Sequence, residues 1–201
     1  MNDTLDPRIV TTLLDLLDQA RQAGDPEPTA MSLATSDGDD RVSVRIVLLK
    51  GVDARGLRFF TNGESRKGLQ LAANPEVALA LHWKTLENGC GAQVRVEGRA
   101  EPLPAQESDA YFVTRPRLSQ IGAWASLQSR DLPDRASFEA RIDAFEQRFG
   151  AGPVPRPPHW GGWLVRPRMV EFWRGRPNRL HERQCWARDA DGAWQSRLLY
   201  P

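Results

Sequence analysis

Hydrophobic and polar residues alternate along the chain with two different periods, one typical of helices and one typical of strands. Near the amino terminus, leucines and other apolar residues recur at helical spacing between residues 8 and 24, which predicts an amphipathic helix. Asp6 suits the N-cap of this helix and Pro7 suits its first turn. We therefore expect an amino-terminal helical segment over residues 1–29, followed by the main domain over residues 30–201.

Strand patterns dominate the rest of the chain. Alternating or continuous apolar runs predict strands over residues 30–36, 41–50, 57–62, 77–83, 93–102, 163–173, 179–187 and 194–200. An Asp-Gly turn is expected at residues 37–40, between the first two strands. Shorter helical patterns cover residues 65–75, 104–115 and 137–149. Because strands and helices do not alternate regularly, we expect an α+β fold, an antiparallel barrel or sheet with peripheral helices, and not a doubly wound parallel sheet.

Length and composition narrow the classes of function. A chain of 201 residues with 40% hydrophobic content can bury a sizeable core in one domain. The formal net charge of +1 lacks the basic excess of a nucleic-acid binder, and no segment approaches the roughly 20 apolar residues of a membrane span. The amino terminus has neither a basic start nor an apolar run. We therefore expect a cytoplasmic protein with no nucleic-acid or membrane partner.

Cysteine and histidine residues give no sign of a disulfide framework or a metal site. Cys90 and Cys185 are far apart in the sequence, and the three histidines are scattered without metal-ligand spacing. Glycine-rich nucleotide motifs of the Rossmann and P-loop types are also absent from the sequence. We therefore expect reduced thiols, no metal, and phosphate sites that are built from side chains.

Two short basic stretches are candidates for anion binding. The stretch "NGESRKG" sets Ser65, Arg66 and Lys67 at the start of a helix, where the helix dipole and free N–H groups favour an anion. In "SVRIVLLKG", Arg45 and Lys50 stand at the two ends of an apolar run. A basic residue at the end of a buried strand often extends to solvent instead, so both interpretations stay open from these residues alone.

A third candidate combines hydroxyl groups with a guanidinium. Tyr111, Arg115 and Ser119 are spaced by four residues, which places the first two on one helical face, while Pro116 resets the chain before the third. Hydroxyl, guanidinium and hydroxyl groups together form a candidate phosphate cup. Considered alone, a tyrosine such as Tyr111 more often lies at the edge of a core.

The stretch "RPNRLHER" contains Arg179, His181 and Arg183 at alternate positions. On a strand these side chains share a face and lie about 7 Å apart, where an effective dielectric of about 20 gives each charged pair a repulsion of roughly 2 kcal/mol. Such a run is either a solvated outer face or an anion site. The stretch alone does not decide between them.

Several stretches carry a resemblance that runs in order from about Ala30 to Pro201. They are "RIVLLKG", "FTNGESRKG", "HWK", "QVRVEG", "SDAYFVTRPR", "SQIGAWAS", "RPPHWGG", "EFWRGRPNRLHER" and "RLLYP". Together they resemble the pyridoxine/pyridoxamine 5'-phosphate oxidase family. The resemblance implies an FMN-binding split β-barrel that forms a homodimer with two FMN sites at the subunit interface. It also implies oxidation of pyridoxamine 5'-phosphate and pyridoxine 5'-phosphate to pyridoxal 5'-phosphate by O2, with release of hydrogen peroxide and, from the amine, ammonia.

The resemblance also assigns roles to residues. For FMN binding it implies Arg45, Ile46, Val47, Leu48, Phe60, Thr61, Ser65, Arg66, Lys67, Gln93, Gln128, Ser129, Trp173 and Arg183. For the substrate phosphate it implies Lys50, Tyr111, Arg115 and Ser119. By the same resemblance Arg179 holds the substrate ring against the flavin, and His181 orients the substrate or moves a proton. A neighbouring chain is expected to complete each site with Gln93, Gln128, Trp173 and Arg183.

Three departures from the family pattern limit these assignments. The loop that contains residues 86–92 is about four residues longer than the pattern, which puts the position of Gln93 in question. Phe60 stands where a tyrosine is common, and Ile46 replaces a frequent methionine with a similar volume. We interpret Cys90, in the longer loop, as an incidental surface thiol.

Two other functions stay open from the sequence. One is a related FMN oxidase of the same fold that acts on another ring system, such as the phenazine-type oxidases. The other is a non-catalytic carrier of flavin or pyridoxal phosphate, which would bind its ligand without oxygen uptake. The sequence does not indicate which of the two phosphorylated substrates is preferred.

Overall fold

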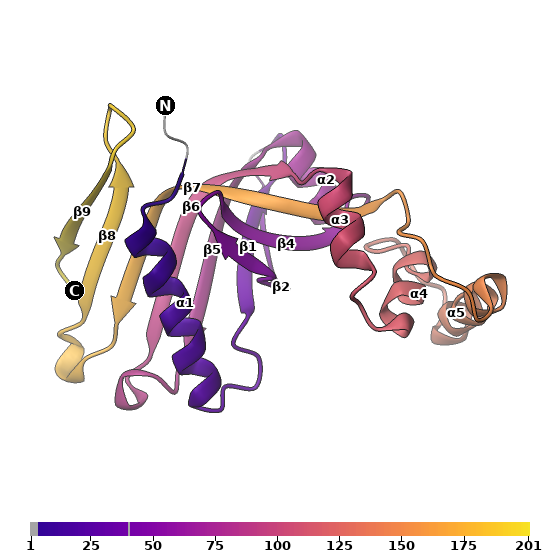
Figure 1. Ribbon diagram of the computed structural model, residues 1–201, viewed down its shortest axis with the longest axis horizontal. Helices are drawn as coiled ribbons and strands as arrows, with labels where there is room; N and C mark the ends of the chain where they lie inside the picture. Colours follow the sequence, from indigo (N-terminus) through magenta and orange to yellow (C-terminus); the bar gives the residue numbers. More distant parts are fainter. Residues whose placement is uncertain (1–3, 40) are drawn as a thin grey trace.

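Nine antiparallel strands form one sheet in the computed structural model, which describes residues 4–39 and 41–201 (Figure 1). The strands are β1 (Ala30–Ser36), β2 (Val42–Leu48), β3 (Gly51–Asp53), β4 (Gly56–Asn62), β5 (Glu76–Trp83), β6 (Ala92–Pro102), β7 (Trp160–Arg174), β8 (Glu182–Arg188) and β9 (Trp194–Leu199). The main path through the sheet runs β2-β1-β5-β6-β7-β4-β3, while β8 pairs with β7 and β9. The predicted α+β class with antiparallel strands is confirmed. Asp40, the last residue of the expected turn, lies outside the described residues.

The long strand β7 divides the sheet into two parts. Its first half, residues 160–165, pairs with β4, and its second half, residues 169–174, pairs with β8. Strand β6 crosses β7 closely at Gly98, where a Cβ would lie 2.3 Å from the carbonyl oxygen of Arg166, so only glycine fits at this register shift. The sheet curls so that β2 contacts β4, which gives the split, partly closed barrel that the sequence predicts.

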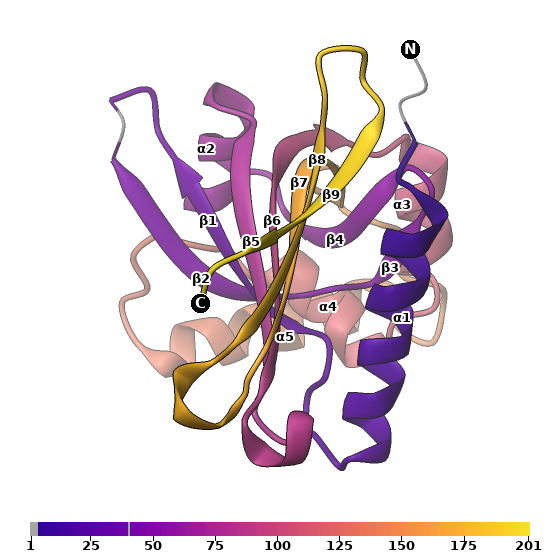
Figure 2. The same ribbon diagram turned by 90° about the vertical axis from the view of Figure 1, so that its left-hand side faces the viewer.

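Helix α1 (Pro7–Gln22) lies alongside the curled sheet (Figure 2). Asp6 caps it by accepting the Arg8 backbone N–H at 2.8 Å, which confirms the predicted start. Leu13 and Leu16 are each 1% exposed and belong to the same hydrophobic core as the strands. The helix therefore stabilises the barrel through apolar burial, and a domain boundary at residue 29 stays a prediction.

The other helices are α2 (Arg66–Ala73), α3 (Ala105–Phe112), α4 (Arg117–Ala125) and α5 (Arg135–Phe149). Helices α4 and α5 lie at the end of the molecule opposite to β8 and β9 (Figure 1). They pack around a second core that contains Phe112, Ile121, Val154 and Trp160. Pro116 separates α3 from α4, which agrees with the expected reset of the chain at this proline, whereas the helix α4 itself was not predicted.

The strand expected over residues 179–187 begins later than predicted. Strand β8 starts at Glu182, after a 3-10 turn that ends at Arg179. Asn178 and Arg179 have φ angles of 57° and 62°, which lie far from the values of a β-strand. The prediction that Arg179 shares a strand face with Arg183 is therefore wrong.

Cys90 is exposed and Cys185 is buried, and both are free thiols, so the interpretation of Cys90 as a surface thiol is confirmed. Within residues 4–39 and 41–201, no helix is long and apolar enough to cross a membrane. In the same described part, no cluster of three or more histidine, cysteine or acidic side chains is arranged to bind a metal.

Candidate active site

A cavity of about 450 Å³ lies where β2 and β4 meet the start of α2 and the turn between α3 and α4. The residues that line it and that the sequence predicts as site residues are Ile46, Val47, Leu48, Lys50, Phe60, Thr61, Lys67, Tyr111, Arg115, Ser119 and Gln128. Arg66 and Ser129 line a neighbouring hollow that also includes Gln128. The structure therefore brings together most of the predicted cofactor and phosphate residues.

The apolar wall of the cavity comes from strand β2, which lies at the edge of the sheet. Val47 is 8% exposed and its side chain belongs to the core, so only its backbone is free to contact a ligand. Ile46 points outward and is 62% exposed. An edge strand carries unpaired backbone N–H and C=O groups, which suits binding of a flat ligand with polar edges.

Lys67 is a cation with only neutral partners. Its Nζ donates to Thr61 Oγ1 at 3.0 Å, to Gln128 Oε1 at 2.9 Å and to Ser65 Oγ at 3.3 Å. Burial, and to a smaller extent the nearby charge of Arg45, lowers the pKa of Lys67 to about 8. Binding of an anion beside Lys67 would stabilise the charged form of this side chain.

The start of α2 adds backbone donors beside Lys67. Ser65 is fully buried and caps the helix by accepting the Gly68 N–H at 3.3 Å. A Cβ on Gly68 would lie 2.2 Å from the Gly63 carbonyl oxygen, so the tight turn at the helix start requires glycine. The predicted helix start is confirmed, and its free N–H groups favour a phosphate.

Arg45 lies beside this region and is half-buried. Its guanidinium donates to Leu33 O at 3.1 Å, to Thr35 Oγ1 at 2.6 Å and to Ser43 Oγ at 2.6 Å. Burial is the main reason that the pKa of Arg45 falls below its usual value, and the charge of Arg66 adds to the effect. Positive charges thus gather around the α2 start.

Arg115 leaves a buried donor without a partner. Its guanidinium lies 4.7 Å from the ring centroid of Trp160, and its Nη1 is buried with no hydrogen-bond partner among residues 4–39 and 41–201. Burial lowers the pKa of Arg115. Since an unpaired buried donor is costly, this atom indicates that a ligand with acceptor oxygens belongs in the cavity.

Tyr111 is oriented by ring stacking. Its ring stacks on Phe60 with a centroid distance of 4.0 Å and an interplanar angle of 17°, and Phe60 stacks in turn near Trp160 at 5.4 Å. Lys50 and Ser119 line the same cavity. The four residues that the sequence predicts for the substrate phosphate thus line one cavity, and their role in phosphate binding stays a prediction.

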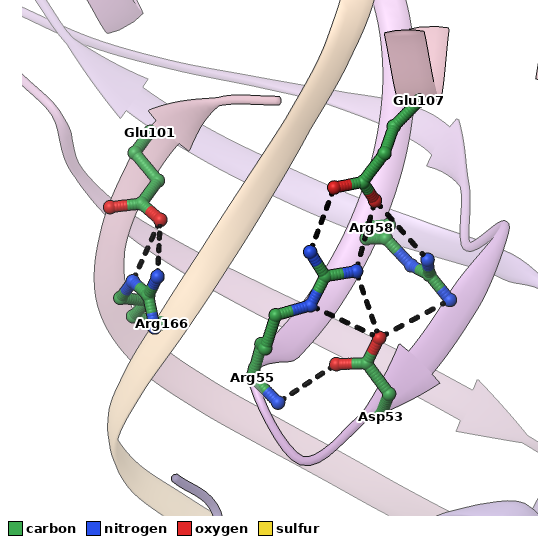
Figure 3. Close-up of polar contacts among 6 residues, drawn as sticks. All are labelled: Asp53, Arg55, Arg58, Glu101, Glu107 and Arg166. Carbon is green, nitrogen blue, oxygen red and sulfur yellow. Dashed lines mark hydrogen bonds and ion pairs between the residues drawn. The ribbon is translucent and has the colours of Figure 1, made fainter. Parts of the chain in front are cut away.

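Ion pairs fix α3 to the strands beside the cavity (Figure 3). The Glu107 carboxylate on α3 accepts two hydrogen bonds from Arg55, at 2.8 and 2.9 Å. Asp53 pairs with Arg55 at 3.1 Å and with Arg58 at 3.5 Å. Because the Lys50 N–H donates to the Arg58 carbonyl at 2.8 Å, this network holds the segment that carries Tyr111 against the segment that carries Lys50.

The remaining predicted residues form a second cluster on the other half of the sheet. Gln93 on β6 lies opposite Trp173 on β7, and Trp173 lies opposite Arg183 on β8. The longer loop before β6 does not remove Gln93 from the strand. The ring of His181 lies 4.5 Å from that of Trp173.

Arg183 in this second cluster is held by a buried carboxylate. Its Nε and Nη2 donate to the two oxygens of Glu171 at 2.8 and 3.1 Å, and Glu171 is 3% exposed. The hydrogen bonds that Arg183 donates to the Glu171 carboxylate raise the pKa of Arg183. This bidentate pair fixes the direction of the guanidinium.

The two clusters are separate within one chain. Among the described residues, Gln93, Trp173, Arg179, His181 and Arg183 do not line the cavity. Figure 1 shows why, since β8 lies at one end of the molecule and α4 at the other. Gln128 differs from the prediction, because it contacts Lys67 in its own chain and needs no neighbouring chain to reach the cavity.

Two residues in these clusters were not singled out from the sequence. Trp160 lies under Arg115, and Glu171 holds Arg183. Trp160 and Arg115 lie on segments that are distant along the chain, and Glu171 and Arg183 lie on adjacent strands. The local spacing of residues in the sequence predicts neither contact. The only sequence signal for Trp160 is its place before the two glycines of "RPPHWGG".

Comparison with protein families gives two matches that together span most of the chain. Residues 17–149 match the family described as pyridoxamine 5'-phosphate oxidase. Residues 160–201 match the pyridoxine 5'-phosphate oxidase C-terminal dimerisation region. The second match includes β8 and β9, which carry part of the second cluster.

Curated relatives share about half of their residues with this chain. A pyridoxine/pyridoxamine 5'-phosphate oxidase from Cupriavidus necator is 55% identical over 184 residues, which cover 92% of this chain and 84% of the relative. Proteins of the same name from Gluconobacter oxydans and Anaeromyxobacter dehalogenans are 53% and 51% identical. The alignments cover 87% and 97% of this chain, and 85% and 96% of those relatives.

Two solved structures resemble the fold closely. PhzG from Burkholderia lata 383, in complex with tetrahydrophenazine-1-carboxylic acid, has a TM-score of 0.88 and 32% identity, and the match covers 96% of this chain and 92% of that one. A pyridoxamine 5'-phosphate oxidase-related, FMN binding protein from Nostoc punctiforme has a TM-score of 0.75 and 17% identity, with 95% and 96% covered. The second likeness concerns the fold alone.

Proposed function

Since the chain belongs to the pyridoxamine 5'-phosphate oxidase family, we propose that it is an FMN-dependent oxidase that converts pyridoxine 5'-phosphate and pyridoxamine 5'-phosphate to pyridoxal 5'-phosphate. The observation that carries this proposal is that two cations line one cavity: Lys67, and Arg115, whose Nη1 has no hydrogen-bond partner among the described residues. Lys67 donates hydrogen bonds to neutral side chains, and one nitrogen of Arg115 has no acceptor within the described residues. The oxygens of phosphate groups would supply charged acceptors to both.

The residues present fit FMN. Lys67, the α2 start and Arg45 are suited to its phosphate, and the edge backbone of β2 is suited to the flat ring system. The chemistry supplied by bound FMN is two-electron oxidation of the substrate C4' carbon with O2 as final acceptor, which yields hydrogen peroxide and, from the amine, ammonia. The side chains bind and orient both molecules.

The substrate is proposed to bind through its phosphate on one chain and through its ring on the other. Lys50, Tyr111, Arg115 and Ser119 would hold the phosphate in the cavity. Arg179 and His181 of a second copy would cover the ring, since neither residue lines the cavity of its own chain. A homodimer with two shared sites is therefore part of the proposal, supported by the match to a dimerisation region.

Binding of FMN is expected to weaken as the pH rises above 8. The lowered pKa of Lys67, about 8, means that the free protein loses this charge between pH 7 and 9, whereas the FMN-bound protein retains it. From this linkage we expect about a tenfold higher Kd at pH 9 than at pH 7. Fluorescence titration of the apoprotein with FMN measures both values.

Two comparisons control the pH experiment. Lys67→Arg keeps its charge at both pH values, so its Kd for FMN should change by less than about twofold. Riboflavin, which lacks the phosphate, should show the same weak dependence with the wild-type protein. A wild-type Kd for FMN that is equal at pH 7 and pH 9 would contradict the role of Lys67.

Turnover assays in air test the proposed function. The purified protein with FMN should consume oxygen and form pyridoxal 5'-phosphate from either phosphorylated substrate, and it should act poorly on unphosphorylated pyridoxine. Turnover of a dihydrophenazine carboxylic acid without turnover of the vitamin phosphates would favour the phenazine-type alternative. Binding of FMN without oxygen uptake from any of these compounds would indicate a carrier.

A further inference from the structure

The loop between β5 and β6 packs directly against the turn that leads to Arg179 and His181. The Gly175 N–H donates to the Gly91 carbonyl oxygen at 2.8 Å. A Cβ on Gly175 would lie 2.1 Å from the Cys90 carbonyl oxygen, so the two backbones touch and a side chain there is excluded. This loop is the segment that the sequence indicates to be longer than the family pattern.

Glu87 supplies the polar part of the contact. Its carboxylate is only 16% exposed and accepts hydrogen bonds from Arg174 Nη1 at 2.5 Å and from Arg176 Nη1. Burial alone would raise the pKa of Glu87, but the hydrogen bonds from Arg176 and Arg174 outweigh it and hold the pKa below its usual value. The carboxylate is therefore charged at neutral pH and binds both guanidinium groups.

Arg176 connects Glu87 to the turn. Its Nε and Nη2 donate to the two Glu182 carboxylate oxygens at 2.9 and 3.0 Å, and its backbone N–H donates to His181 Nδ1 at 3.2 Å. The last bond requires an unprotonated Nδ1, so neutral His181 carries its proton on Nε2. Arg176 thus sets both the start of β8 and the tautomer of His181.

The turn needs such support because its backbone is strained. Arg179 has a φ of 62°, a left-handed conformation that is uncommon for a residue with a long side chain. Asn178 shares this conformation with a φ of 57°. Residues held in such conformations persist where surrounding contacts fix them, and the contacts of Glu87 and Arg176 lie on this turn.

We propose that Glu87 is a positioning residue for the reaction, which acts by holding Arg176 and thereby fixing the turn that presents Arg179 and His181 to the substrate ring. This inference rests on the proposed function, because it assigns the turn to the substrate. Glu87 does not line the cavity, so it acts through the turn and not on the phosphate.

Glu87→Gln tests the proposal, since it keeps the size of the side chain and removes its charge. Relative to wild type, kcat for pyridoxine 5'-phosphate should fall about tenfold, because a small displacement of orienting groups has a large effect on rate. The Kd for FMN should stay within about twofold, because the phosphate end of the cavity is untouched. Hydrogen exchange of the segment 174–182 in the free protein, followed by mass spectrometry, should become faster.

Glu76→Gln is the matched control. Glu76, at the opposite end of β5, also lies between two arginines, Arg99 and Arg168. Its loss should leave kcat and the exchange of segment 174–182 at wild-type values. An equal fall in kcat for both variants would mean that any lost ion pair on this sheet has the same effect, and it would overturn the proposal.

A double variant separates action through the turn from a general effect. In the Arg179→Ala background, Glu87→Gln should reduce kcat by a smaller factor than in the wild-type background, because one of the two groups that it positions is gone. Additive losses, a wild-type kcat for Glu87→Gln, or unchanged exchange of segment 174–182 would each overturn the proposal. If wild-type protein oxidised none of the substrates while Glu87→Gln still accelerated exchange, the proposed function would fail and the structural contact would stand.

Discussion

Arg115→Ala is expected to raise the KM for pyridoxine 5'-phosphate about 100-fold, which corresponds to about 2.7 kcal/mol. The reason is that Arg115 lines the cavity and its Nη1 has no hydrogen-bond partner within the described part of the chain, and charge-assisted hydrogen bonds to phosphate are worth about 1.5–3 kcal/mol each. Steady-state kinetics with both phosphorylated substrates measure the effect. The Kd for FMN should change by less than about twofold, because Lys67 and the α2 start are intact.

Two controls accompany this variant. Arg135→Ala removes an exposed arginine. Among the described residues, Glu139 is the carboxylate that pairs with its guanidinium. This variant should leave the KM for pyridoxine 5'-phosphate unchanged. Unphosphorylated pyridoxine should be oxidised at similar low rates by wild-type protein and Arg115→Ala. If Arg115→Ala also lowered the rate of pyridoxine oxidation 100-fold, Arg115 would maintain the fold and would not bind phosphate.

Mixed dimers are expected to regain activity that neither parent variant has. Arg115→Ala damages the cavity, and Arg179→Ala damages the turn, where loss of the planar cation should lower kcat and raise KM. If each site combines the cavity of one chain with the turn of the other, a dimer with one chain of each kind has one intact site. Two-tag purification of this mixed dimer should give about half of the wild-type kcat per dimer, since a two-fold symmetric dimer has two equivalent sites.

The opposite arrangement gives a different result. If cavity and turn of the same chain formed a site, every site in the mixed dimer would carry one damaged half, and activity would stay at the level of the parent variants. As a control, a dimer that combines Arg115→Ala with Lys50→Ala damages the same half in both chains. It should show no recovery under the shared-site arrangement.

Local spacing indicated part of the candidate site. The helix start at Ser65 is where the sequence places it, and Tyr111, Arg115 and Ser119 line one cavity. The prediction that Tyr111 and Arg115 share a helical face is wrong, because α3 ends at Phe112 and Arg115 lies in the bend before Pro116. The N-cap of α1 and the strand periodicity likewise follow from neighbouring residues. These features depend on contacts within a few turns or strand positions, which the sequence pattern encodes directly.

Contacts between distant segments were not predictable in this way. Trp160 contacts Arg115, and Glu87 contacts Arg176, although the two residues of each pair are far apart along the chain. The hydrophobic periodicity of the sequence does not predict such contacts. The left-handed backbone at Arg179 was also missed, because alternation of charged residues suggested a strand where tertiary contacts impose a turn. The three-residue strand β3 is too short for a periodic signal.

The separation of the two clusters is the feature that the sequence indicated only through family resemblance. Within one chain, the groups proposed for the phosphate lie between β2 and α4, and those proposed for the ring lie beside β8. The apolar positions Val42, Val44 and Ile46 on β2 are 70%, 67% and 62% exposed. An exposed apolar edge of this kind is typical of a surface that another chain covers.

Anaerobic reaction of the FMN-loaded protein with excess pyridoxine 5'-phosphate is the sharpest test of the proposed oxidation, because it observes electron transfer from this substrate to the flavin without turnover. We expect that the visible absorbance of oxidised flavin disappears, that one pyridoxal 5'-phosphate forms per FMN, and that product formation resumes only when oxygen is admitted. Flavin that stays oxidised in the presence of bound substrate, with no pyridoxal 5'-phosphate formed, would contradict the proposed function.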